Sequence, residues 1–140
     1  MSDVITVIAP VNIAVIKYWG KRDEDLILPL NDSVSATLDT SVMCAKTSVC
    51  ARSDFSDDEI WLNKEKVPFS KRLINCLREI KARAAAQKTV DEVFLQWKVH
   101  ICSENNFPTA AGLASSAAGY ACLVTALAKL YKGLHTKRNH

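Results

Sequence analysis

A stretch of small residues at positions 105–119, where a loop is expected to turn into a helix, most constrains the fold. It reads Asn-Asn-Phe-Pro-Thr-Ala-Ala-Gly-Leu-Ala-Ser-Ser-Ala-Ala-Gly. Pro108 ends the preceding extended segment, Gly112 permits a close backbone approach, and Ser115 and Ser116 lie where an Ala-rich helix begins. The unpaired N–H groups of a helix start favour anions, and the hydroxyls can bind phosphate or phosphate-bound Mg²⁺. The stretch therefore predicts a phosphate-binding loop.

Other interpretations of this stretch stay open. It is not a Walker A loop, because no lysine follows Gly112 or Gly119. A helix of Ala, Gly and Ser can also simply pack closely against a sheet, and composition alone favours that interpretation. A membrane span is disfavoured, because the uncharged segment 110–128 is mostly Ala, Ser and Gly rather than large aliphatic residues.

Composition limits the class of protein. The 140 residues suit one domain, and 49% hydrophobic with 24% charged residues is the balance of a soluble globular protein. The net charge of +3 is compatible with small anionic ligands and too weak to indicate a nucleic-acid partner.

Cysteine usage indicates the compartment. The five cysteines are odd in number and form no Cys-x-x-Cys motif, so we expect neither a disulfide framework nor a zinc site. The expected location is therefore a reducing cytoplasm. The N-terminus has no basic segment, and its apolar stretch is broken by Pro10 and Asn12, unlike a signal peptide.

Hydrophobic periodicity predicts an α+β sandwich with helices on one face of a sheet. Alternation in 33–38 predicts a half-buried strand, and the polar pair Asn63-Lys64 a tight turn. The expected strands are 5–9, 33–38, 40–51, 59–62 and 94–102, and the expected helices are 70–86 and 112–132. Residues 11–19 are expected to form a further strand or an extended turn.

A second motif, at residues 9–23, places cations directly after an apolar strand. It reads Ala-Pro-Val-Asn-Ile-Ala-Val-Ile-Lys-Tyr-Trp-Gly-Lys-Arg-Asp. Lys17, Lys21 and Arg22 can bind a phosphorylated or carboxylated ligand, with Tyr18 as a hydroxyl donor and Gly20 allowing close backbone approach. Taken alone, the segment is better explained as a strand end with solvated lysines and a core tryptophan.

Taken together, the two motifs resemble the mevalonate diphosphate decarboxylases, members of the galactokinase–homoserine kinase–mevalonate kinase–phosphomevalonate kinase superfamily. The run from Ala9 to Asp23 is distinctive of the decarboxylases, and residues 108–116 look like the superfamily phosphate loop. Ala114 stands where the small-molecule kinases usually have glycine. The resemblance extends over about residues 5–133 and implies the ribosomal protein S5 domain 2-like fold of the family's N-terminal domain.

The resemblance implies that Mg-ATP phosphorylates the tertiary hydroxyl of mevalonate 5-diphosphate. Loss of that phosphate and of CO₂ then gives isopentenyl diphosphate, for isoprenoid and sterol biosynthesis. ATP as co-substrate and Mg²⁺ are the implied cofactors. The family also implies a cytoplasmic homodimer without membrane insertion.

Site residues are implied by position within the matching motifs. Lys17 and Ser116 match catalytic positions, and Ser116 is the serine nearest Mg²⁺. The substrate set is Tyr18, Trp19, Gly20, Lys21 and Arg72, and the ATP set is Asn105, Pro108, Ala110, Ala111, Gly112, Leu113, Ala114, Ser115 and Ser116.

Later family segments have no counterpart in the sequence. A Gly-Ser-Gly-Ser-Ala-Cys-Arg segment, a Phe-Asp-Ala-Gly-Pro-Asn segment with the catalytic aspartate, and a ferredoxin-like domain are not matched. We therefore expect an incomplete N-terminal domain at 1–133 and a divergent tail at 134–140, in a truncated form inactive by itself. A non-catalytic nucleotide- or partner-binding module, and a superfamily kinase that does not decarboxylate, are the alternatives.

Overall fold

The computed structural model describes residues 4–17, 19–23, 28–107 and 115–132. The described strands are β1 (Ile5–Pro10), β2 (Asn12–Ile16), β3 (Lys21–Asp23), β4 (Leu28–Pro29), β5 (Val34–Thr37), β6 (Cys44–Arg52), β7 (Glu59–Leu62), β8 (Glu65–Val67) and β9 (Lys98–Asn105). The described helices are α1 (Lys71–Gln87), α2 (Glu92–Gln96) and α3 (Ser115–Leu130).

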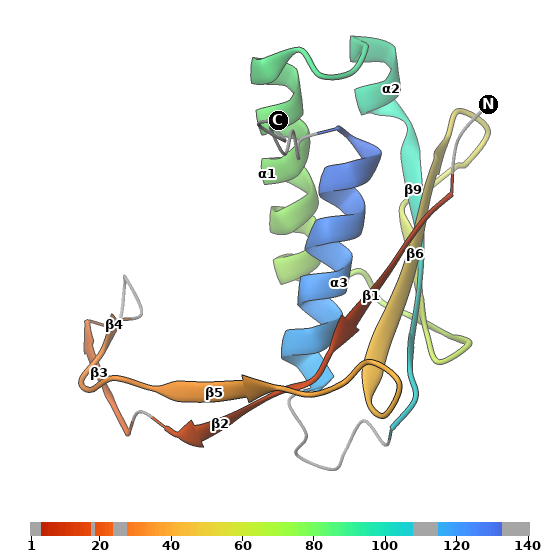
Figure 1. The fold of residues 1–140 in the computed structure, drawn as a ribbon. Helices are drawn as coiled ribbons and strands as arrows, with labels where there is room; N and C mark the ends of the chain where they lie inside the picture. Colours follow the sequence, from red (N-terminus) through yellow and green to blue (C-terminus); the bar gives the residue numbers. More distant parts are fainter. Residues whose placement is uncertain (1–3, 18, 24–27, 108–114, 133–140) are drawn as a thin grey trace, which may run out of the picture.

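Five strands form the main sheet, in the order β1-β6-β9-β7-β8. The long strand β6 pairs antiparallel with β1 on one side and with β9 on the other, whereas β7 runs parallel to β9. The helices α1 and α3 lie side by side against one face of this sheet (Figure 1). The predicted α+β sandwich with helices on one face is therefore confirmed.

The core lies between that sheet face and the two long helices. Side chains alternate along β6, so that Ala45, Thr47, Val49 and Ala51 are buried while their neighbours are less so. The core cluster consists of Val49, Ala51, Ile60, Leu73, Leu77, Ala84, Val99, Ile101, Leu123, Ala126, Leu127, Leu130 and Tyr131.

The predicted helix at 70–86 is confirmed as α1, and its start has a clear cause. Ser70 is the N-cap, and its hydroxyl oxygen accepts a hydrogen bond from the Leu73 backbone N–H at 3.2 Å. Lys88, in the left-handed conformation, ends the helix. Leu73, Leu77 and Ala84 are the residues that α1 buries against the core.

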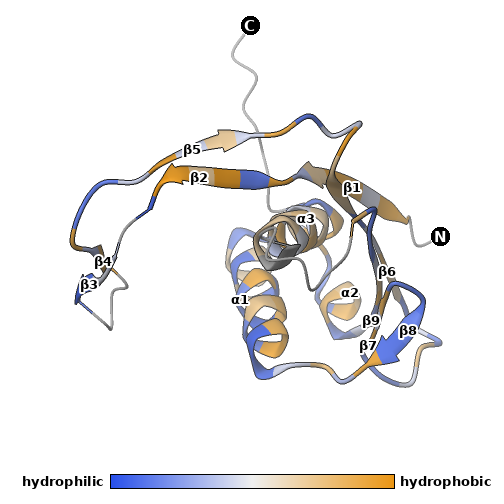
Figure 2. Cartoon of the chain, turned by 90° about the horizontal axis from the view of Figure 1, so that it is seen from below, coloured by the Kyte–Doolittle hydropathy of each residue, from blue (hydrophilic) through white to orange (hydrophobic). Residues whose placement is uncertain are grey.

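Two strands outside the main sheet, β2 and β5, pair into a ribbon that projects from the body, with the β3–β4 pair at its far end (Figures 1 and 2). We call residues 12–17, 19–23 and 28–37 the arm. The strand predicted at 33–38 exists, but its predicted half-burial is wrong: all four residues of β5 are exposed. Alternation produces burial only where another layer covers one face, and β5 pairs with β2 alone.

The strand predicted at 94–102 begins later than expected. Phe94 and Leu95 belong to the short helix α2, and β9 begins at Lys98. Phe94 reaches the core from the helix, since its ring meets that of Tyr131 edge-on with centroids 5.6 Å apart. Leu95 of this helix and its C-cap Trp97 continue the alternation of Val99 and Ile101 by coincidence.

The packing predicts that Leu127→Ala destabilises the chain by about 2–5 kcal/mol, because Leu127 is fully buried and its removal leaves a cavity. Urea denaturation followed by circular dichroism measures this loss. The matched control is Val124→Ala in the same helix, which should change stability by about 0.5 kcal/mol or less because Val124 is 40% exposed. Equal losses for both variants would contradict the packing of α3.

Candidate functional site

Five buried residues connect the bases of the two sequence motifs. Phe107 and Ala118 stand on either side of the predicted phosphate loop, and both pack with Val11, Ala45 and Cys122. We call these five residues the anchor cluster. Val11 belongs to the N-terminal motif, so one cluster fixes the end of β1 and both sides of the loop. Cys122 donates to the Ala45 carbonyl at 3.0 Å, and burial raises the pKa of its thiol.

Asn106 fastens the approach to the loop. Its side-chain oxygen accepts from the Cys44 N–H at 2.8 Å, and its side-chain nitrogen donates to the Val42 carbonyl at 3.1 Å. Its backbone N–H donates to the Cys44 carbonyl at 3.2 Å. Asn106 was not among the predicted site residues, and this role depends on contacts more than 60 positions away in sequence.

The β7–β8 hairpin supports the same region. Asn63 and Lys64 both have positive φ, so the predicted tight turn is confirmed. The side-chain oxygen of Asn63 accepts from the Asn105 N–H at 2.9 Å, and the Asn63 N–H donates to the Ser103 carbonyl at 2.8 Å. The hairpin is therefore tied to the end of β9, where Asn105 lies.

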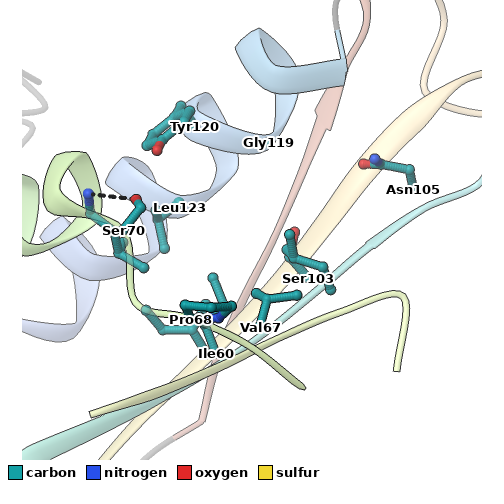
Figure 3. Close-up of a pocket in the computed structure, with 12 residues that line it drawn as sticks. Ile60, Val67, Pro68, Ser70, Ser103, Asn105, Gly119, Tyr120 and Leu123 are labelled. Carbon is teal, nitrogen blue, oxygen red and sulfur yellow. Dashed lines mark hydrogen bonds between the residues drawn. The ribbon is translucent and has the colours of Figure 1, made fainter. Parts of the chain in front are cut away.

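A cavity of about 290 Å³ opens between the β7–β8 hairpin, β9 and the starts of α1 and α3 (Figure 3). Its floor is apolar, with Ile60, Leu62, Val67, Pro68, Leu73, Ile101 and Leu123. Its remaining residues are polar, small or aromatic: Ser70, Ser103, Asn105, Gly119 and Tyr120. An apolar floor with a few polar groups is the usual form of a small-molecule site.

Gly119 leaves room at the α3 side of this cavity. A Cβ atom built on Gly119 would meet no atom within 4 Å, so the missing side chain is open space rather than a packing contact. Gly119 belongs to the sequence stretch that predicted the phosphate loop, and Asn105 belongs to the predicted ATP set.

Arg72 lies beside the cavity, in the first turn of α1. Its guanidinium carbon lies 5.6 Å from the ring centroid of Tyr120, a cation–π distance. Tyr120 in turn lines the cavity. Arg72, predicted to bind substrate, therefore contacts a residue of the cavity that Asn105, predicted to bind ATP, also lines.

The other described substrate residues lie on the arm. Asn31 holds them in place: its side-chain nitrogen donates to the Lys17 carbonyl, and its oxygen accepts from the Trp19 N–H, both at 3.4 Å. The Gly20 carbonyl accepts from the Leu30 N–H at 3.0 Å. Lys21 begins β3 and is exposed. The side chain of Trp19 is 90% exposed, which excludes the core tryptophan considered above.

Several predicted residues lie outside the described residues: Tyr18, Pro108, Ala110, Ala111, Gly112, Leu113 and Ala114. Ser115 and Ser116 form the first turn of α3. Two residues that the sequence did not indicate, Asn31 and Tyr120, support the site. The polar run at 31–33 is a turn signal that could have revealed Asn31, whereas Tyr120 carries no local signal.

Comparison with solved structures identifies the class as the N-terminal domain of mevalonate diphosphate decarboxylases. The Trypanosoma brucei enzyme superposes with a TM-score of 0.76 at 47% identity, over 93% of this chain and 34% of that one. The Enterococcus faecalis enzyme, whose structure concerns a mevalonate diphosphate mediated ATP binding mechanism, superposes with a TM-score of 0.66 at 34% identity. The match covers 94% of this chain and 38% of that one.

The chain belongs to the diphosphomevalonate decarboxylase family, since residues 9–140 match the model of the diphosphomevalonate decarboxylase-like N-terminal domain. The curated cattle (Bos taurus) diphosphomevalonate decarboxylase is 53% identical over 134 residues, 91% of this chain and 34% of that protein. The chain thus spans about one third of the length of its curated relatives. Among the described residues, no helix is long and apolar enough to cross a membrane.

Asn106→Ala is predicted to destabilise the chain by about 1–2 kcal/mol, because its two side-chain hydrogen bonds, to Val42 and to Cys44 at the start of β6, are lost. Urea denaturation measures the effect. Glu104→Ala, at an exposed position two residues earlier, is the control and should stay within about 0.5 kcal/mol of the parent chain. An unchanged free energy of unfolding for Asn106→Ala would show that Asn106 does not fasten the approach to the loop.

Proposed function

We propose that this chain forms the nucleotide- and diphosphate-binding part of an ATP-dependent decarboxylase of mevalonate 5-diphosphate. One observation carries the proposal: Asn105 and Gly119 from the loop motif and Tyr120, in contact with Arg72, meet around one cavity. Family membership supplies the reaction, and the cavity supplies a place for the nucleotide.

The nucleoside of ATP fits the apolar side of this cavity. Ile60, Val67 and Ile101 offer a surface for a base, and Ser103 and Asn105 offer hydrogen-bonding groups beside it. From there the phosphates would extend toward residues 108–116 and the start of α3, where backbone N–H groups favour anions. Mg²⁺ would enter as Mg-ATP, with Ser116 as the hydroxyl nearest to it, since the described residues contain no acidic cluster that could hold a metal alone.

The substrate diphosphate is assigned to Tyr18, Trp19, Gly20, Lys21 and Arg72. Two polyanions must approach each other for phosphoryl transfer, and fixed cations offset their repulsion. Lys17, which matches a family lysine near the transferred phosphate, would neutralise charge that develops as the γ-phosphoryl group transfers. Departure of that phosphate with CO₂ then leaves isopentenyl diphosphate. The enterococcal relative suggests the order of events, with bound mevalonate diphosphate favouring ATP binding.

The family reaction also uses an aspartate from a segment that these 140 residues do not match. We therefore propose that the 140 residues by themselves bind both ligands without completing the reaction. The described cysteines are all free thiols, as a reducing cytoplasm would maintain them, and a homodimer is the proposed assembly.

A binding module without catalysis is the second candidate. The observation that favours it is the exposed apolar surface of the arm, where Val15 is 74% and Trp19 90% exposed. Side chains of this kind, gathered on a projecting ribbon, are typical of a surface that another polypeptide covers.

The purified chain, given Mg-ATP and mevalonate 5-diphosphate, is predicted to release neither ADP nor CO₂ above background while binding both ligands. Coupled assays for ADP and for CO₂ measure the two products together. ADP without CO₂ would indicate a kinase, and release of both would contradict the proposed inactivity. Failure to bind either ligand would contradict the proposed site.

Gly119→Ala is predicted to raise the stability of the chain and to lower its affinity for the nucleotide. Alanine should stabilise α3 by about 0.5–1 kcal/mol because glycine is the poorer helix former. The added methyl group enters open cavity space, so affinity for a non-hydrolysable ATP analogue should fall about tenfold. Thermal unfolding and calorimetric titration measure the two effects.

Ala121→Gly is the matched control, at an exposed position of the same helix. It should lower stability by a similar amount and leave affinity for the analogue unchanged. Equal affinities for Gly119→Ala and the parent chain would exclude this cavity as the nucleotide site.

A further inference from the structure

Tyr120 contacts two groups that the proposed function assigns to different ligands. On one side, it lines the cavity assigned to the nucleotide, together with Gly119 and Leu123. On the other side, the Arg72 guanidinium lies 5.6 Å from its ring centroid. Figure 3 shows Tyr120 projecting from α3 toward the start of α1, where Ser70 caps the helix that carries Arg72.

Arg72 contacts this ring through its guanidinium group. Its side chain is long and exposed, and no carboxylate in the described part of the chain forms an ion pair with it. An arginine of this kind loses much rotamer freedom when it binds an anion. A ring that already holds the guanidinium lowers that cost before the anion arrives.

We propose that Tyr120 is a positioning residue that couples the two ligands: a nucleotide in the cavity fixes the ring, and the ring fixes Arg72 for the substrate diphosphate. The inference rests on the proposed function, since it takes the cavity as the nucleotide site and Arg72 as a diphosphate ligand. By linkage, a diphosphate on Arg72 strengthens nucleotide binding by the same factor. Tyr120 touches neither reacting atom and acts through Arg72.

The ring rather than the hydroxyl carries the effect, because the guanidinium interacts with the aromatic face. Tyr120→Phe therefore keeps the coupling, and Tyr120→Leu removes it while leaving an apolar side chain at the cavity. A cation–π contact at an exposed site corresponds to a factor of about two to five in affinity. The coupling carried by Tyr120 is expected to be of that size.

Calorimetric titration of the full 140-residue chain tests the inference. Affinity for the magnesium complex of a non-hydrolysable ATP analogue is measured with and without saturating mevalonate 5-diphosphate, and the ratio of the two affinities is the coupling factor. The parent chain and Tyr120→Phe should give a factor of about two to five, and Tyr120→Leu a factor near one. The reverse titration, with the diphosphate as the varied ligand, should give the same factor.

Two variants complete the design. Val67→Ala alters the cavity from β8 without changing Tyr120 or Arg72, so it should lower affinity for the analogue and leave the coupling factor unchanged. Arg72→Gln removes the cation from an exposed position and should also bring the factor to one. It keeps the test decisive if Tyr120→Leu does not fold.

The outcomes distinguish the two levels of the account. Suppose that the parent chain binds both ligands and that Tyr120→Leu retains the parent coupling factor. The inference is then overturned and the proposed function stands. Arg72→Gln serves in the same way where Tyr120→Leu does not fold. A coupling factor of one in the parent chain, with both ligands bound, would also overturn the inference and leave the proposed function standing. If the parent chain binds no analogue, the proposed function fails, and the inference fails with it.

Discussion

The packing of Phe107 and Ala118 on Val11 is the contact on which the rest of the site depends. Phe107 ends the approach from β9, Ala118 lies in the second turn of α3, and Val11 follows β1. This contact adds a direct link between the loop motif and the N-terminal motif to the packing of α3 on the sheet. With it, the arm and the start of α3 leave the body at neighbouring points. Ala45, which is fully buried near the start of β6, completes the cluster from the sheet.

The site is divided between a rigid body and a projecting arm. The cavity lies on the sheet and on the two long helices, whose side chains are fixed by the core. The cations of the N-terminal motif are instead presented by paired short strands, which Asn31 and Ser33 join by hydrogen bonds to the backbone of Ile16, Lys17 and Trp19. Arg72 is the assigned diphosphate ligand that stands on the body. A ligand that bridges the arm and Arg72 would therefore connect the two parts.

Sequence patterns predicted the body better than the arm, for a physical reason. The 3.6-residue period of α1 and the alternation in β9 reflect burial against a covering layer, and there the sequence and the structure agree. The alternation at Val34–Thr37 is equally clear, yet nothing in the described chain covers that ribbon. A pattern records the face that a strand prefers to bury and cannot supply the layer that buries it.

The supporting residues of the site were harder to predict than its motifs. Asn105 and Arg72 could be predicted as site residues because each stands in a segment that resembles a known family, and their roles stay predictions. Tyr120 and Asn106 act across the fold. Tyr120 contributes a ring contact between two helices. Asn106 forms hydrogen bonds from the end of β9 to the start of β6 and the segment just before it. Such contacts depend on the folded arrangement of distant segments, so a single sequence gives no local sign of them.

The central claim is that the cavity between the β7–β8 hairpin and α3 receives the nucleotide. Its most direct test is a titration of the ¹⁵N-labelled chain with the magnesium complex of a non-hydrolysable ATP analogue, followed residue by residue by NMR. The account predicts saturable shifts at the amides of Ser103, Asn105, Gly119 and Tyr120. Saturable shifts confined to Trp61, His100 and Cys102 on the opposite face of the sheet, or no saturable shifts, would contradict it.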